Sequence, residues 1–395
     1  MNKDLKSLIV PKIKTATVGL INDSHSRVKV CDFDTIQHKQ VGQFFALYHP
    51  VYANKYLEYF NDEEYTDFLI FENNKVYIDY SDNLFTFHKI IDQEKVLVLD
   101  LDNQEIKETE KDEINEDNER SDEGICSKTD LITLSYFPLC ISHCNITLCY
   151  EQDLPQVLSS ELLVQFLQLY QIEKNNSLVC GYDSLGAGCV INHLHFEFLM
   201  LDDFSMNEMG SLPIAKVESF PIMETKLKHK NEEEISLFDG TTLVKLSKIK
   251  EPIFGWKIEC ITKHKDDEHA QQENQDMLMM SETSLHQNSI SHVANVIMTK
   301  LIDGEIPHNL IIGNLGTVFY LFPRQFEKKE HEINSCWNDI AGFVTCKHES
   351  VYNEITEEKI KMFFKNEVSI QESKLDEITN EVVEQISSVY EVEKF

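Results

Sequence analysis

The chain has 395 residues, of which 42% are hydrophobic and 10% aromatic, enough for a large core and for two packed subdomains. Its formal net charge of −32 argues against general binding to nucleic acid or to an anionic membrane. The ten cysteines stand singly, the start lacks a secretory signal, and no apolar run reaches the length of a membrane span. We therefore expect a cytoplasmic protein.

The first half of the chain alternates strand and helix patterns around one acidic segment. Residues 102–123 carry eleven acidic and three basic residues, so we expect a solvated, disordered insertion over about 102–127. An acidic partner-binding segment is the alternative. Strands are predicted at 131–134, 146–148, 177–180 and 189–200, and a helix beginning at Ser159 and Ser160 carries apolar residues on one face, namely Leu163, Phe166, Leu167 and Tyr170.

The second half repeats this order of elements. Strands are predicted at 256–261, 309–312 and 318–322, with a helix through Ile290 and Leu301 before the last two. A polar loop is expected at about 263–282, and C-terminal helices at about 356–390. The last helix is amphipathic, so it either packs onto the body of the protein or forms a dimer contact.

The segment His193-Leu194-His195-Phe196-Glu197 carries the strongest chemical signal. Alternation along a strand would place His193, His195 and Glu197 on one face, just after a Gly-rich turn at 181–188. Such a turn presents backbone N–H groups to an anion, and an imidazole beside it suggests phosphate chemistry with a histidine nucleophile. A packing role or a metal pair would explain the histidines equally simply, although no third ligand stands at zinc spacing. The residues by themselves favour the packing role.

A resemblance to a known family favours a catalytic role for these histidines over a packing role. Gly-Tyr-Asp-Ser-Leu-Gly at 181–186, followed by Asn-His-Leu-His-Phe-Glu at 192–197, resembles the signature of the GDP-L-galactose and GDP-D-glucose phosphorylases. These enzymes are a branch of the histidine-triad superfamily, related to galactose-1-phosphate uridylyltransferase. Further similar segments follow in the family's order, at 84–90, 138–143, 212–216, 306–312, 322–323, 339–342 and 352–354. The likeness covers about residues 75–390.

The resemblance implies an α+β fold of the histidine-triad type, with two such halves in one chain and antiparallel sheets flanked by helices. The expected organisation is a divergent N-terminal region at 1–74, a half with the triad motif at 75–212, and a half without it at 213–395.

The resemblance also implies a mechanism that needs no cofactor or metal. His195 would attack the α-phosphorus of a GDP-hexose, release hexose-1-phosphate, and pass the guanylyl group to phosphate. His193 and Glu197 complete the expected catalytic set. Nucleotide or phosphate binding is expected from residues that match other family segments, namely Lys89, His143, Asp183, Ser184, Gly186, Asn192 and Lys216.

Four positions depart from the family pattern. Asp183 and Glu197 put carboxylates where the family has neutral side chains, while Ser142 and Phe343 replace a glycine and a histidine. One repulsive charge pair at about 4 Å costs roughly 4 kcal/mol at an effective dielectric near 20. Protonation of Glu197 would relieve it, because burial raises a carboxyl pKa, and activity would then rise toward acid pH.

Three functions therefore remain: a GDP-hexose phosphorylase, a catalytically inactive relative serving a larger assembly, and another histidine-triad nucleotide hydrolase or transferase. The substrates of the first would be a GDP-hexose and phosphate, without nucleic-acid or membrane partners. A homodimer is compatible with each function.

Overall fold

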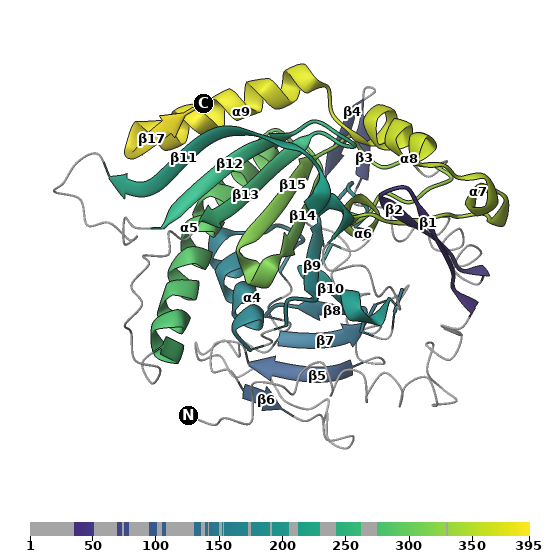
Figure 1. Cartoon of the computed structure of the whole chain (residues 1–395), viewed down its shortest axis with the longest axis horizontal. Helices are drawn as coiled ribbons and strands as arrows, with labels where there is room; N and C mark the ends of the chain where they lie inside the picture. The colour runs from purple at the N-terminus through teal and green to yellow at the C-terminus, as the bar shows by residue number, and fades with distance from the viewer. Residues whose placement is uncertain are drawn as a thin grey trace.

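A twelve-stranded sheet runs through both halves of the chain (Figure 1). The computed structural model describes residues 35–50, 69–72, 75–78, 95–100, 105–107, 130–135, 139–140, 142–149, 152, 154–172, 175–189, 192–204, 212–229, 242–261, 275–328 and 331–395. Neighbouring strands of this sheet all pair antiparallel. Across the sheet the order is β17 (Tyr390–Lys394), β11 (Ser219–His229), β12 (Leu243–Ile249), β13 (Gly255–Ile261), β15 (Val318–Pro323), β14 (His308–Gly313), β9 (Leu178–Asp183), β10 (His195–Met200), β8 (Cys144–Thr147), β7 (Asp130–Leu134), β5 (Lys95–Asp100) and β6 (Glu105–Lys107).

The two halves of the chain meet where β9 pairs with β14. In this register Asn309 lies opposite Asp183, and Ile311 lies opposite Gly181. Strand β10, which carries His195, is the other neighbour of β9. The candidate site therefore lies beside the junction, and residues from the second half reach it.

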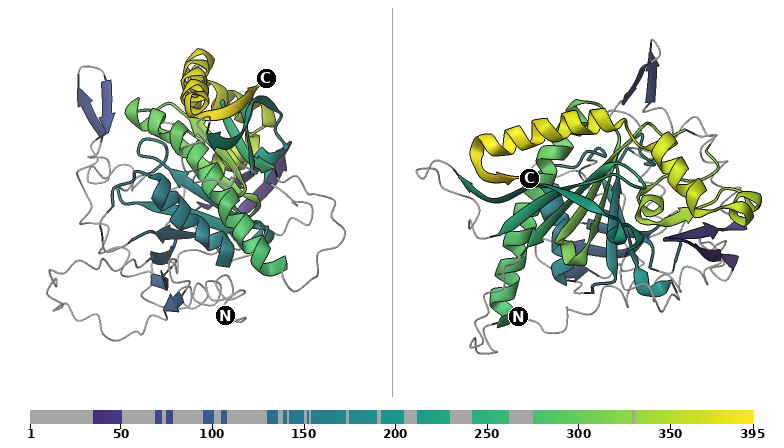
Figure 2. Two further views of the ribbon diagram at one scale, coloured as in Figure 1. Left: turned by 90° about the vertical axis from the view of Figure 1, so that its left-hand side faces the viewer. Right: turned by 45° about the horizontal axis from the view of Figure 1, so that its top comes forward.

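Helices cover one face of the sheet (Figure 2). Helix α5 (Gln275–Asp303) contacts both α4 (Ser160–Ile172) and α9 (Glu372–Val389), as well as strands β12, β13 and β15. Alternation along the strands sends Phe196 and Phe198 into this core, together with Phe166 of α4. The stacked rings of Phe166 and Phe196, 3.8 Å apart, fix β10 against the helix layer.

A smaller sheet and short helices cover the opposite face. Strand β2 (Phe44–Tyr48) pairs antiparallel with β1 (Gln37–Val41) and parallel with β16 (Phe343–Thr345). Buried residues of this layer form a second core with Leu199, Ile311 and Trp337. The remaining elements are β3 (Leu69–Glu72), β4 (Lys75–Ile78), η5 (Leu201–Asp203), η6 (Pro213–Lys216), η7 (Asn314–Gly316), α6 (Trp337–Ala341), α7 (Glu349–Glu354), α8 (Glu357–Phe363) and η8 (Phe364–Val368).

The predicted α+β class is confirmed, and three local predictions need correction. The motif strand begins at His195 rather than at residue 189, because the chain bends at Asn192 and His193. Strand β6 lies within the expected acidic insertion, most of which falls outside the described residues. Helix α5 begins at Gln275 and so replaces the end of the expected polar loop. The division into two triad-type halves stays a prediction.

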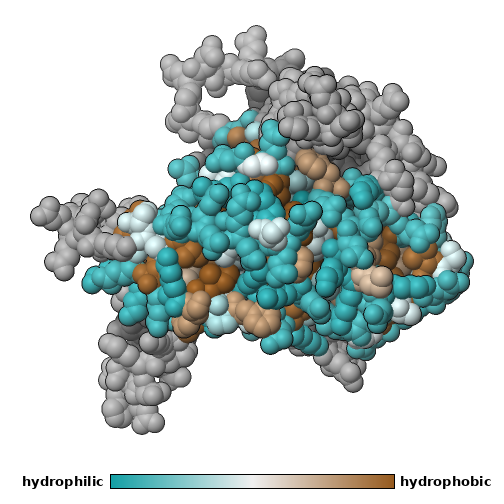
Figure 3. All heavy atoms as spheres, turned by 90° about the horizontal axis from the view of Figure 1, so that it is seen from above, coloured by the Kyte–Doolittle hydropathy of each residue, from teal (hydrophilic) through white to brown (hydrophobic). Residues whose placement is uncertain are grey.

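The face of the molecule seen from above is mostly polar (Figure 3). Seen from above, the described residues are mostly hydrophilic, and hydrophobic residues form separate small areas (Figure 3). Within the described part of the chain, no helix is long and apolar enough to cross a bilayer.

Lys248 on β12 attaches helix α9 to the sheet. Its ammonium group lies 2.5 Å from Asp376 and 3.2 Å from Glu372, and its side chain is only 11% exposed.

Lys248→Met should lower the free energy of unfolding by about 1–2 kcal/mol, because two carboxylates lose a partly buried partner. Urea denaturation measures this loss. Lys374→Met, which removes an exposed pair with Glu377, is the control and should change stability by less than about 0.5 kcal/mol. Equal losses would contradict the anchoring role.

Candidate functional site

The ring of His195, the first residue of β10, is held in one tautomer. Its Nδ1 lies 2.8 Å from the carbonyl oxygen of His193. Because a carbonyl oxygen can only accept, Nδ1 carries the proton and the lone pair is on Nε2. Burial lowers the pKa of His195, although the His193 carbonyl and the charge of Glu197 oppose this shift. At neutral pH the ring is therefore neutral and has the form needed for nucleophilic attack.

Gln156 holds β9 and β10 apart at this histidine. The ladder between the two strands ends with the pair of Glu197 and Gly181. Beyond it, Gln156 Nε2 donates to the carbonyl oxygens of Asp183 (2.8 Å) and His195 (3.1 Å), while its Oε1 accepts from the His195 N–H (2.9 Å). The carboxamide thus replaces direct strand pairing and sets the position of His195. No sequence pattern had marked this residue.

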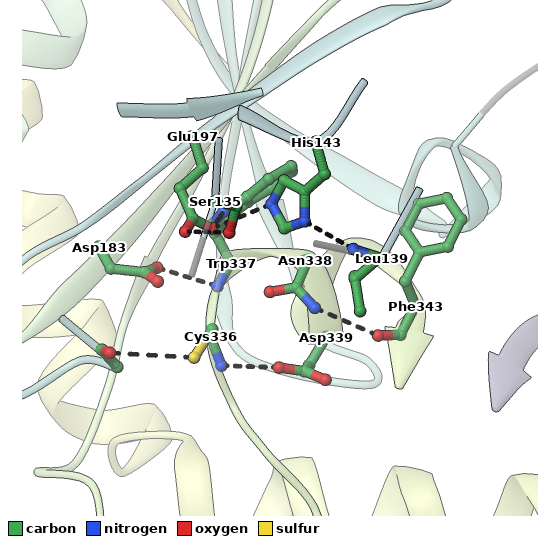
Figure 4. A network of polar contacts seen from close by, with 11 residues as sticks. Ser135, Leu139, His143, Asp183, Glu197, Cys336, Trp337, Asn338, Asp339 and Phe343 are labelled. Atoms are coloured by element: carbon green, nitrogen blue, oxygen red, sulfur yellow. Dashed lines mark hydrogen bonds and ion pairs between the residues drawn. The ribbon is translucent and has the colours of Figure 1, made fainter. Parts of the chain in front are cut away.

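Three donors converge on Glu197 (Figure 4). The indole Nε1–H of Trp337 donates to Oε2 at 2.7 Å, and the Ser135 hydroxyl donates to Oε1 at 3.3 Å. His143 Nε2 lies 3.3 Å from Oε2, and its Nδ1 accepts from the Leu139 N–H, so Nε2 is the nitrogen that donates. The predicted site residues His143 and Glu197 are therefore in direct contact.

This network favours the ionised form of Glu197, one of the two states that the sequence leaves open. Burial alone would raise the pKa of this carboxyl, but His143, Trp337 and His195 outweigh it and lower the pKa to about 2. Glu197 is consequently ionised between pH 5 and 8. The condition for a rise of activity toward acid pH, a protonated Glu197, is therefore not met in this range.

Asp183 at the end of β9 has a raised pKa, in contrast to the lowered pKa of Glu197. Its Oδ1 accepts from the backbone N–H of Trp337 at 2.9 Å and from the side-chain amide of Asn309. Burial and the nearby charge of Glu197 raise the pKa of Asp183 well above its usual range. Of the two carboxyls that depart from the family pattern, Asp183 is thus the one that favours the neutral form.

Trp337, the first residue of α6, lies between the two carboxyls (Figure 4). Its ring packs against the backbone of Gly181, where an added Cβ would come within 1.8 Å of the indole. The indole N–H goes to Glu197 and the backbone N–H to Asp183. Sequence analysis missed Trp337, although it stands two residues before the quoted segment at 339–342.

The Gly-rich turn is partly engaged in its own bonds. The N–H of Ser184 donates to the His308 carbonyl and that of Ala187 to the Ser184 carbonyl, so these two groups are used within the protein. Gly186 and Gly188 have φ angles of +77° and +105°, which glycine adopts readily. Buried Arg324 donates to the Ala187 carbonyl at 3.1 Å, which places a cation beneath the turn. This arginine too was not predicted.

Three other predicted residues, Asn192, His193 and Lys216, are not among the contacts of Glu197. Asn192 Oδ1 accepts from the Gln156 N–H at 3.0 Å, a structural role, and the His193 side chain is fully buried. Exposed Lys216 on η6 lines a surface cavity of about 370 Å³. Lys89 lies outside the described residues.

Comparisons with known proteins agree with the motif order. Residues 54–199 match the model of the GDPGP1-like N-terminal domain, and residues 275–389 match that of the GDPGP1-like C-terminal domain. The chain is 23% identical to GDP-L-galactose phosphorylase 2 of Arabidopsis thaliana over 247 residues, 59% of this chain and 46% of that protein. The chain thus matches about half the length of this curated relative.

Solved structures of yeast Ap4A phosphorylase Apa2 are also similar, at 12% identity. The complex with Ap4A has a TM-score of 0.45, and the match covers 92% of this chain and 99% of that chain. For the complex with AMP the TM-score is 0.46, with 94% and 99% covered.

Replacing Trp337 with Phe tests its bond to Glu197. The phenyl ring should keep the contact with Gly181 but lose the N–H donor to a carboxylate, at a cost of about 1.5–3 kcal/mol in unfolding free energy. The matched control is Trp256→Phe, since Trp256 is equally buried but donates to the neutral hydroxyl of Thr379. Its loss should be about 1 kcal/mol, as measured by chemical denaturation. A larger loss for the control would contradict a charged network at Trp337.

Glu197→Gln tests the ionisation of this carboxyl. A folded-state pKa of about 2, against the usual 4.5, means that Glu197 adds stability above pH 4.5 and loses it as the pH falls toward 2. The difference in unfolding free energy between wild type and variant should change by up to about 3 kcal/mol as the pH falls from 4.5 toward 2. Urea titrations at several pH values measure it, and the absence of any change below pH 4.5 would contradict an ionised Glu197.

Proposed function

This chain belongs to the GDPGP1-like family, and we propose that it is a GDP-hexose phosphorylase that uses His195 as its nucleophile. The observation that supports the proposal most directly is the tautomer of His195. Its Nδ1–H is fixed on the His193 carbonyl, and its lone pair is on Nε2. The cytoplasm is the proposed location.

The reaction would proceed in two displacements. The Nε2 lone pair attacks the α-phosphorus of GDP-hexose, a P–N bond forms, and the bond from this phosphorus to the bridging oxygen breaks, which releases hexose-1-phosphate. An oxygen of inorganic phosphate then attacks the same phosphorus, the P–N bond breaks, and GDP leaves. The Nδ1 proton stays on the ring throughout, so neither step requires His195 to lose a proton.

The environment of His195 suits the covalent intermediate. A guanylylated imidazole that keeps its Nδ1 proton is cationic, and the His193 carbonyl accepts a stronger hydrogen bond from it. The ionised Glu197 also stabilises positive charge on this ring, as its effect on the pKa of His195 indicates. Glu197 would therefore oppose an anionic substrate but favour the intermediate. Arg324 beneath the Gly-rich turn supplies positive charge near Asp183.

The second candidate is a relative without catalytic activity that serves an assembly. The ionised Glu197 favours this candidate, because a carboxylate bonded to His143 and Trp337 repels phosphate and offers no donor to it.

A third candidate, a histidine-triad enzyme acting on another nucleotide, would use the same histidine. A panel of nucleotide sugars would identify the nucleotide base and the hexose of the substrate, and size-exclusion chromatography would give the oligomeric state.

Incubation with GDP-glucose or GDP-L-galactose labelled in the α-phosphate tests the proposal. The wild type should form an acid-labile adduct on His195 and release hexose-1-phosphate, and added phosphate should discharge the adduct as GDP. His195→Asn should form none, while Lys374→Met, a change on the exposed surface of α9, should form it as the wild type does. Absence of both adduct and phosphorolysis from pH 5 to 8 would overturn the phosphorylase in favour of the second candidate. Labelling by a different nucleotide would favour the third.

A further inference from the structure

Two buried polar atoms on β8 lack a hydrogen-bond partner in the part of the chain that the structure describes. They are Asn145 Oδ1 and Thr147 Oγ1, in side chains that are 3% and 0% exposed. A buried polar group without a partner has lost its hydrogen bonds to water and has gained none within the protein. Native proteins contain few such groups. Two such groups on one short strand therefore need an explanation.

Strand pairing places both atoms beside the candidate nucleophile. Thr147 lies directly opposite His195, and Asn145 lies directly opposite Glu197. Residues directly opposite one another in antiparallel strands project from the same face, with Cβ atoms about 4.5–5.5 Å apart. The residue between them, Ile146, packs into the core under the other face, as Phe196 does on β10. Asn145 and Thr147 thus belong to the His195 face.

The chemistry of these groups identifies the kind of ligand. An amide oxygen and a hydroxyl are neutral, so they do not compensate the charge of a phosphate, but they bind hydroxyl groups well. A nucleotide sugar carries hydroxyl-bearing rings on both sides of its diphosphate. We infer that Asn145 and Thr147 bind the hydroxyl groups of a sugar ring of the substrate, an inference that rests on the proposed function.

Asn145→Leu and Thr147→Val test the inference, because each should raise the stability of the protein and lower its affinity for the ligand. Each change removes an unsatisfied polar group and keeps roughly the same side-chain size. Each variant should therefore unfold at a higher urea concentration than the wild type. Each should also bind GDP-glucose about tenfold more weakly by calorimetry, the effect of losing one hydrogen bond to the ligand.

Ser247→Ala is the matched control. Ser247 Oγ on β12 is also buried without a partner, but β13, β15, β14 and β9 separate its strand from β10. This variant should be stabilised like the others and should bind GDP-glucose as the wild type does. A loss of affinity in the control would show that the effect is not local to Asn145 and Thr147, and would overturn the inference.

Three ligands distinguish the two sources of sugar hydroxyls. Weaker binding of both GDP and GDP-glucose by the variants supports contact with the ribose. Weaker binding of glucose-1-phosphate and GDP-glucose, with GDP unchanged, supports contact with the hexose. Unchanged affinity for all three, or a loss of stability that marks a buried water as the partner, overturns the inference while the phosphorylase proposal stands. Failure of the wild type to bind any of them would overturn both.

Discussion

The indole of Trp337 is the contact on which the candidate site depends. It lies against the bare backbone of Gly181, and its N–H donates to Glu197 on β10, while the backbone N–H of the same residue donates to Asp183 on β9. Any side chain at position 181 would displace it. A residue that is distant in sequence thereby fixes the relative position of Asp183 and Glu197, and with them the strand that carries His195.

The two carboxyl groups of the site differ in the protonation state that their surroundings favour. Glu197 has three donors around it and is ionised, whereas Asp183 is buried beside that charge and favours the neutral form. The negative charge of the site is thus concentrated on Glu197, close to the imidazole. In the proposed reaction, a cationic intermediate on His195 would gain from this arrangement, while an incoming phosphate would not.

The sequence predicted those parts of the site that depend on local patterns. Alternation placed His195 and Glu197 on one face and Phe196 in the core, and the order of motifs indicated the family before any geometry was known. Long-range contacts had no such signal. Gln156 bridges β9 and β10 from the loop before α4, whereas Arg324 and Trp337 reach the site through the pairing of β9 with β14 and the packing of α6, so their roles could not be read from spacing. The state of Glu197 was left open for the same reason, because its donors come from three separate segments.

The pairing of β9 with β14 also limits how the molecule can be divided. A chain cut between β10 and β11 would leave β9 as a sheet edge, with a row of buried N–H and C=O groups exposed to solvent and to other chains. The fragment from the second half would expose β14 in the same way. Each half would then tend to pair with whatever strand it met, including a copy of itself. The two halves therefore protect one another from aggregation, and their repeated order of elements does not make them independent units.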